Sequence, residues 1–88
     1  MKQIRRTSQF KTDVKRMKRR GKDLGNLKGV LEKIASGQEL EPRHRDHVLV
    51  GQYRGTRECH IEPDWLLIYE KAESVVLIRT DTHSDLFK

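Results

Sequence analysis

Three histidines in the second half of the chain are the side chains best suited to chemistry. His47 lies in a polar segment rich in charge, His60 lies in an apolar stretch typical of a strand, and His83 follows the last such stretch. An imidazole gives or takes a proton near neutral pH, so two or three of them in one cleft would form an acid–base pair. A single surface histidine is more often structural, so their grouping in the fold decides whether they form a site.

A metal site is not expected from the ligand-type residues. Cys59 and His60 are adjacent in an expected strand, so their side chains should point to opposite faces. His44 and His47 are three positions apart without a second ligand pair, and the chain has no Cys-x-x-Cys or His-Glu-x-x-His motif. It also has no glycine-rich phosphate loop and no serine nucleophile elbow. We therefore expect acid–base chemistry without a metal or another cofactor.

Two helices are predicted in the first half of the chain. Residues 2–7 read as a short extended segment, and Ser8 is a suitable helix N-cap. A helix to about residue 20 follows, and a second is expected over 23–36, joined to the first near Gly21. Apolar residues recur on one face of each helix, at Phe10, Val14 and Met17 and then at Leu24, Leu27, Val30, Leu31 and Ile34.

The second half is predicted to form a sheet. Residues 38–50 contain a proline and many charges, and they read as a loop. Segments 57–62, 64–70 and 75–80 have the length and composition of strands, and the short turn at 71–74 makes an antiparallel hairpin of the last two. We expect a single α+β domain over residues 1–88, with the helical hairpin packed on one face of an antiparallel meander.

Positive charge is concentrated at the beginning of the chain. Residues 1–28 hold eleven Lys and Arg against two Asp, a balance of +9, whereas the remaining residues carry −3 of the net +6. This polarity favours a nucleic-acid partner over an acidic protein partner or a merely solvated helix face. The single cysteine, Cys59, is typical of a reducing cytoplasm, and no apolar run is long enough to span a membrane.

Three segments of the second half carry a resemblance to a known family. They read Asp-His-Val-Leu-Val-Gly (46–51), Arg-Glu-Cys-His-Ile-Glu-Pro-Asp-Trp-Leu-Leu-Ile-Tyr (57–69) and Arg-Thr-Asp-Thr-His-Ser-Asp-Leu-Phe (79–87). In this order and spacing they resemble YafQ-type toxins, a branch of the RelE/ParE superfamily. The resemblance implies a RelE-like fold and a ribosome-dependent endoribonuclease that cuts messenger RNA. Val48 and Asp81 depart from the family pattern, where proline and glycine respectively are common.

The resemblance also implies which residues form the site. RNA supplies its own nucleophile, the 2′-hydroxyl, so the protein needs a base, an acid and charge stabilisation, but no metal. His47, His60 and Asp64 are alternative bases, and His83 is the favoured acid. Arg57 and Arg79 are candidates for binding the phosphate. The remaining family positions are Trp65, interpreted as shaping the cleft, and Phe87, which either stacks on an RNA base or folds back onto the core.

We expect one partner on which the protein docks and another that inhibits it. The basic first helix, including Lys15, Arg16 and Arg19, should dock on ribosomal RNA. An antitoxin with an acidic, disordered toxin-binding segment should neutralise the protein, and the complex should bind its own operator DNA through the antitoxin. The rival interpretations are a ParE-like gyrase inhibitor and a non-catalytic RNA-binding module, and neither of them cleaves RNA.

Overall fold

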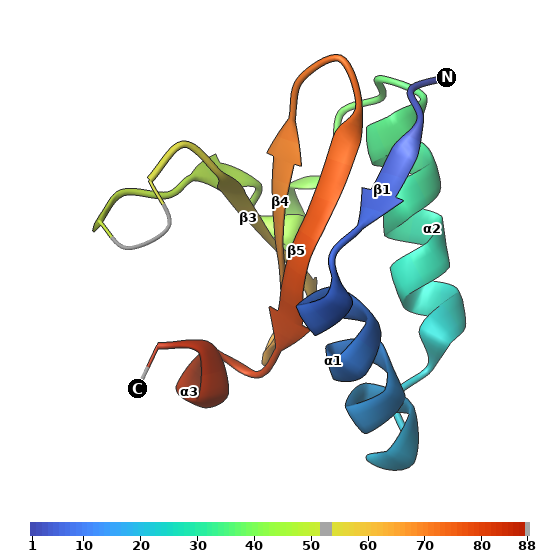
Figure 1. Cartoon of the computed structure of the whole chain (residues 1–88), viewed down its shortest axis with the longest axis vertical. Helices are drawn as coiled ribbons and strands as arrows, with labels where there is room; N and C mark the ends of the chain where they lie inside the picture. Colours follow the sequence, from blue (N-terminus) through green and yellow to red (C-terminus); the bar gives the residue numbers. More distant parts are fainter. Residues whose placement is uncertain (52–53, 88) are drawn as a thin grey trace.

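The computed structural model describes residues 1–51 and 54–87, and within them the chain has the expected α+β architecture (Figure 1). The elements in chain order are β1 (Ile4–Arg6), α1 (Ser8–Arg19), α2 (Leu24–Ala35), the 3₁₀ helix η1 (Pro42–His44), β2 (His47–Val48), β3 (Arg57–Glu62), β4 (Trp65–Lys71), β5 (Val75–Asp81) and α3 (His83–Leu86). The prediction of a helical hairpin followed by a strand meander is confirmed.

The strands of the described residues form one sheet in the order β1-β5-β4-β3-β2. The pairs β3–β4 and β4–β5 are antiparallel, as predicted, while β1 joins the other edge of β5 in parallel. One prediction is wrong. The segment 38–50 is not entirely a loop, because His47 and Val48 form β2 and pair with Glu58 and Arg57 of β3. Two residues carry no readable periodicity, so this strand depends on its partner.

The helix ends follow from their caps. Thr7, not Ser8, is the N-cap of α1, and its Oγ1 accepts a hydrogen bond from the Phe10 amide at 3.1 Å. Asp23 caps α2 through its carboxylate, which accepts from the Gly25 amide at 2.8 Å. Between the helices Gly21 has a φ of 83°, a conformation that favours glycine and ends α1. The first helix therefore begins one residue earlier than predicted.

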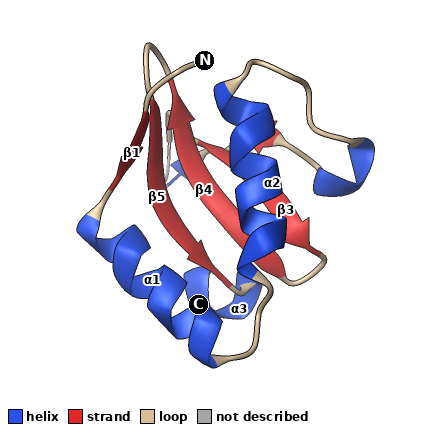
Figure 2. Cartoon of the chain, turned by 90° about the vertical axis from the view of Figure 1, so that its right-hand side faces the viewer, coloured by secondary structure: helices blue, strands red, loops and turns tan. Residues whose placement is uncertain are grey.

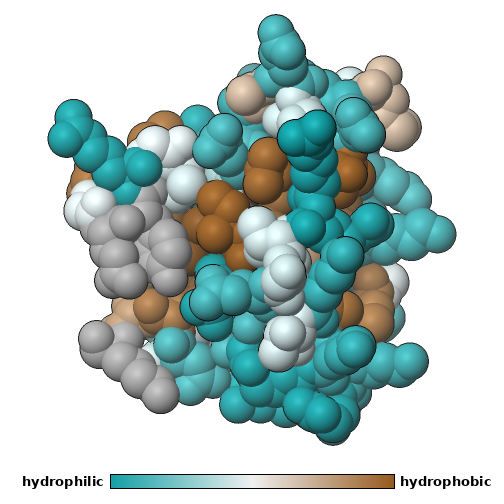
Figure 3. Space-filling view, viewed as in Figure 1, coloured by the Kyte–Doolittle hydropathy of each residue, from teal (hydrophilic) through white to brown (hydrophobic). Residues whose placement is uncertain are grey.

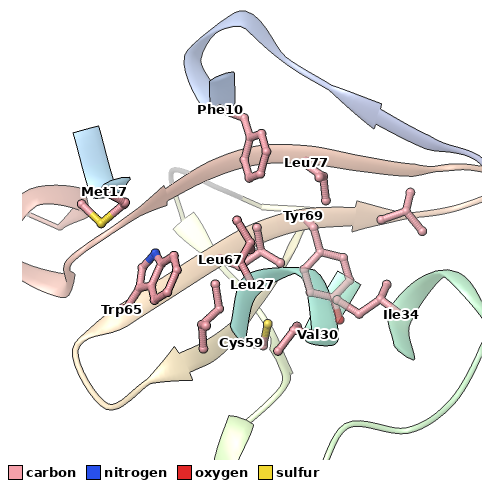
Figure 4. Packing of buried hydrophobic residues seen from close by; sticks show 12 residues of the cluster. Phe10, Met17, Leu27, Val30, Ile34, Cys59, Trp65, Leu67, Tyr69 and Leu77 are labelled. Atoms are coloured by element: carbon pink, nitrogen blue, oxygen red, sulfur yellow. The ribbon is translucent and has the colours of Figure 1, made fainter. Parts of the chain in front are cut away.

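Helices α1 and α2 cover one face of the sheet, as predicted (Figure 2), and the main core lies between them and the strands. Figure 4 shows this core around the fully buried Trp65. The short helix α3 was not predicted, and it lies on the opposite face of the sheet (Figure 1). There Leu86 packs with Leu66 and Ile68 in a second, smaller cluster. Both faces of the central strand are therefore covered.

A buried carboxylate joins α1 to β5. Asp13 is only 2% exposed, and its oxygens accept hydrogen bonds from Arg16 Nη2 at 2.5 Å, Arg79 Nε at 2.7 Å and the Thr80 amide at 3.1 Å. A charge at this depth would be strongly destabilising without such partners. The arrangement therefore fixes the position of α1 along the end of β5.

Replacing Asp13 by Asn should lower the free energy of unfolding by about 3 kcal/mol or more, because the change removes the buried negative charge that both Arg16 and Arg79 contact. Urea denaturation followed by circular dichroism measures this loss. The exposed neighbour Lys15 provides the control, since Lys15→Ala should change stability by less than about 0.5 kcal/mol. Equal stability of the two variants would mean that the carboxylate does not fix α1.

Candidate active site

Two histidines direct the same ring nitrogen at one buried carboxylate. Nε2 of His47 and Nε2 of His60 each lie 3.6 Å from Oε1 of Glu58, whose side chain is 7% exposed. The pairing of β2 with β3 sets His47 opposite Glu58, and His60 follows Glu58 by two positions, so it lies on the same face of β3. Glu58 was missed from the sequence, although this strand alternation placed it beside His60.

Backbone carbonyl groups fix the tautomer of both rings. Nδ1 of His47 lies 2.7 Å from the carbonyl oxygen of Arg45, and Nδ1 of His60 lies 3.2 Å from that of Pro63. A carbonyl oxygen only accepts, so each Nδ1 carries the proton and Nε2 remains to exchange one. At 3.6 Å from Glu58, a protonated Nε2 would form an ion pair with the carboxylate. Two ring nitrogens that could exchange a proton therefore lie beside one carboxylate.

The carboxylate of Asp46 holds the segment that carries His47. It accepts from Arg57 Nε and Nη2 at 3.3 and 3.2 Å, and Oδ1 accepts from the Tyr69 hydroxyl at 2.6 Å. The hydrogen bond to Asp46 raises the pKa of Arg57, and burial together with Asp46 raises the pKa of Tyr69. Arg57, expected to bind phosphate, is thus committed in part to fixing the backbone before His47.

His83 is the first residue of α3, and Phe87 directly follows the helix as its C-cap. Their ring centroids are 5.2 Å apart at an interplanar angle of 42°, and both residues are exposed. Thr82 caps the helix by accepting a hydrogen bond from the Asp85 amide. Leu86, not Phe87, is the residue that folds back onto the sheet. The Phe87 ring therefore has surface available for a base, with His83 beside it.

The histidine pair and α3 share one face of the sheet. Across β3 and β4, Glu58 is in register with Ile68 and His60 with Leu66, and these two apolar residues are the ones that Leu86 covers. Asp64 is exposed in the tight turn that joins β3 to β4, close in sequence to His60. The pair of histidines and the residues of α3 therefore lie on the same face of the sheet, beside the same apolar residues.

Three residues predicted to shape or bind the RNA site have partners within the fold. Trp65 is fully buried and its Nε1 donates to Thr80 Oγ1 at 2.8 Å, so it has no surface to offer to RNA. The partly exposed Arg79 guanidinium donates to the buried carboxylate of Asp13. Arg16, expected to point outward from α1, instead pairs with Asp13 and the buried Asp81. These arginines stabilise the fold, whereas Lys15 and Arg19 are exposed as predicted.

Among residues 1–51 and 54–87, no three histidine, cysteine, aspartate or glutamate side chains are grouped as a metal site requires. The expectation of metal-free chemistry therefore stays a prediction. In the same residues, no helix is long and apolar enough to cross a membrane.

Known proteins similar to this chain include several toxins. Residues 2–88 match the family described as the bacterial toxin YafQ of type II toxin–antitoxin systems. The mRNA interferase toxin YafQ of Escherichia coli K12 is 36% identical over 86 residues, covering 96% of this chain and 94% of that protein. The toxin in the E. coli DinJ–YafQ toxin–antitoxin complex is 35% identical with a TM-score of 0.90, covering 99% of this chain and 98% of that one. A metal-bound toxin from Helicobacter pylori is 37% identical with a TM-score of 0.92, covering 99% and 100%.

The burial of Trp65 separates stability from RNA contact. Trp65→Phe should lower the free energy of unfolding by about 1–3 kcal/mol, because Thr80 Oγ1 loses its buried donor. The folded variant should bind a short RNA as tightly as the parent protein. Phe87→Ala is the matched comparison and should weaken RNA binding without this loss of stability. Circular dichroism in urea and fluorescence anisotropy of labelled RNA give the two readouts. If folded Trp65→Phe bound RNA more weakly than the parent protein, Trp65 would have a role in RNA binding after all.

Proposed function

The chain belongs to the YafQ family of bacterial type II toxin–antitoxin toxins, and we propose that it is an endoribonuclease that cleaves messenger RNA on the ribosome. The observation that carries the proposal is the pair of histidines facing Glu58, on the same sheet face as His83. These groups could supply a base and an acid without a metal. The name of the E. coli relative, mRNA interferase, agrees with this chemistry.

We assign the base to His60. Its side chain is less exposed than that of His47, at 18% against 50%, and it lies in register with the apolar Leu66. Its Nε2 takes the proton of the 2′-hydroxyl while the 2′-oxygen forms a bond to phosphorus. Once Nε2 of His60 carries the proton, the Glu58 carboxylate 3.6 Å away would form an ion pair with the imidazolium. His47, at the edge of the sheet, contacts the charged phosphate, and Asp64 is the alternative base.

We assign the acid to His83. As the bond from phosphorus to the 5′-oxygen breaks, this oxygen takes a proton from the imidazolium of His83. The products are a 2′,3′-cyclic phosphate and a 5′-hydroxyl end, so atoms and charges balance without a water or a metal. Stacking of a base on Phe87 would bring the scissile phosphate toward the neighbouring His83 ring.

The exposed cations of α1 are proposed to dock the protein on ribosomal RNA. Figure 3 shows hydrophilic side chains gathered over α1, at the lower right of the view. The exposed cationic residues of this helix are Lys11, Lys15, Lys18 and Arg19. An antitoxin would neutralise the protein in the cytoplasm, as the complex of the E. coli relative with DinJ suggests. Its acidic segment would suit the same basic surface, and the complex would bind operator DNA through the antitoxin.

The ends of the RNA products test the mechanism. Wild-type protein should leave cyclic or 3′-phosphate ends and 5′-hydroxyl ends on ribosome-bound messenger RNA. His60→Ala, His83→Ala and Glu58→Gln should each slow cleavage by about 10²–10⁴-fold while remaining folded, because each removes part of the proton transfer. Primer extension and end-specific ligation measure both properties. Ends with a 5′-phosphate would show a metal-activated water instead, and the absence of any cleavage would favour a ParE-like inhibitor or an RNA-binding module.

Reversal of two exposed charges tests the docking surface. In a His83→Ala background, Lys15→Glu with Arg19→Glu should weaken binding to ribosomes and reduce the slope of log K against log salt by about one unit per lost phosphate contact. Lys28→Glu with Lys71→Glu changes the net charge equally at exposed positions outside α1. Ribosome pelleting at several salt concentrations compares the two. If both pairs lowered affinity equally, binding would follow net charge, and α1 would have no special role.

A further inference from the structure

The helix α3 is too short to be stable by itself. It has four residues, and its backbone hydrogen bonds join the Leu86 amide to the Thr82 carbonyl and the Phe87 amide to the His83 carbonyl. A single helical turn in water is strongly unfavourable because nucleation fixes several backbone angles for few hydrogen bonds. Its geometry must therefore come from contacts with the rest of the fold.

One arginine at the end of α1 connects this helix to the body of the protein. Nη1 of Arg20 donates to Asp85 Oδ2 on α3 at 3.0 Å and to Asp81 Oδ1 at the end of β5 at 3.3 Å. Asp81 is itself firmly held. It is 2% exposed, its second oxygen accepts from Arg16 at 2.6 Å, and Oδ1 also accepts from the Thr82 amide at 2.8 Å. Arg20 thus bridges a fixed anion and an anion on the short helix.

The bridge restrains how α3 is turned about its axis. Successive residues are about 100° apart around a helix, so Asp85 and His83 lie about 200° apart. Holding Asp85 toward Arg20 therefore turns His83 away from α1, while Leu86 enters the apolar cluster on the sheet. The hydrogen bond from Arg20 also lowers the pKa of Asp85, which keeps this carboxylate charged.

We propose that Arg20 is a positioning residue for the RNA cleavage, because its bridge between Asp81 and Asp85 sets the orientation of α3 and with it the His83 imidazole. The inference rests on the role of His83 in the proposed function. Arg20 and Asp85 have side chains that are 44% and 32% exposed, and ion pairs of this kind contribute little to global stability. The effect of breaking the Arg20–Asp85 contact is therefore local. When Arg20 is replaced, the buried Asp81 still accepts hydrogen bonds from Arg16 and the Thr82 amide, so the fold survives.

Two variants that break the same contact from opposite sides test the proposal. Arg20→Gln and Asp85→Asn should each increase amide hydrogen exchange at Leu86 and Phe87, while exchange in β4 and β5 stays unchanged. Each should lower kcat for cleavage of ribosome-bound RNA by about tenfold with little change in KM, because the acid is misaligned but docking is intact. The double variant should be no worse than either single one, and Arg20→Lys should recover part of the rate.

The charge change separates positioning from docking. Asp85→Asn removes a negative charge and should not weaken binding to ribosomal RNA, so a loss of kcat in this variant cannot come from docking. Arg5→Gln, at an exposed position on β1, controls for the loss of one positive charge. Unchanged exchange at Leu86 and Phe87, or a defect in Arg20→Gln alone, would overturn the proposal. A wild-type protein that does not cleave RNA would overturn the proposed function instead, and the exchange measurement would still decide whether Arg20 holds α3.

Discussion

The arrangement of α1, β5 and α3 depends on the hydrogen bonds of the buried Asp13 carboxylate. This carboxylate joins the middle of α1 to the end of β5 through Arg79 and the Thr80 amide. Thr80 in turn accepts from the buried Trp65 ring and donates to the Leu66 carbonyl, so the same contact extends into β4. Because α3 follows directly after β5, the position of α1 against β5 also determines where the last helix begins.

This constraint divides the basic charge of α1 into two sets. Arg16 and Arg20 face β5 and α3, where they neutralise acidic groups that are buried or partly buried. Lys15 and Arg19 remain in solvent, where a polyanion can reach them. Net charge alone does not distinguish these sets. The net charge of +9 over residues 1–28 therefore overstates the charge available for docking, because some of these cations form ion pairs within the fold.

The elements with strong periodicity were predictable, and those that depend on distant partners were not. The periodicity of apolar residues within each segment was enough to predict α1, α2 and the strands after residue 57. By contrast, β2 exists because β3 offers it hydrogen bonds, and α3 exists because Leu86, Thr82 and Arg20 hold it. Within the site, family positions indicated His47, His60 and His83. Trp65, Leu67 and Tyr69 alternate along β4 and share its core face, so spacing does indicate the burial of Trp65. The partner of Arg79 could not be read from spacing, since it depends on how α1 packs against β5.

Asp81 shows how a buried acid can be compensated by residues elsewhere in the chain. A carboxylate at this buried position has to be stabilised by cations or hydrogen-bond donors, because charges in protein interiors are costly. Arg16 of α1, Arg20 at the C-cap of α1 and the Thr82 amide supply these donors. The buried acid therefore creates an electrostatic connection between the basic helix and the end of the chain. Through Arg20 that connection reaches Asp85, so the element that carries His83 is held by charges located more than sixty residues earlier.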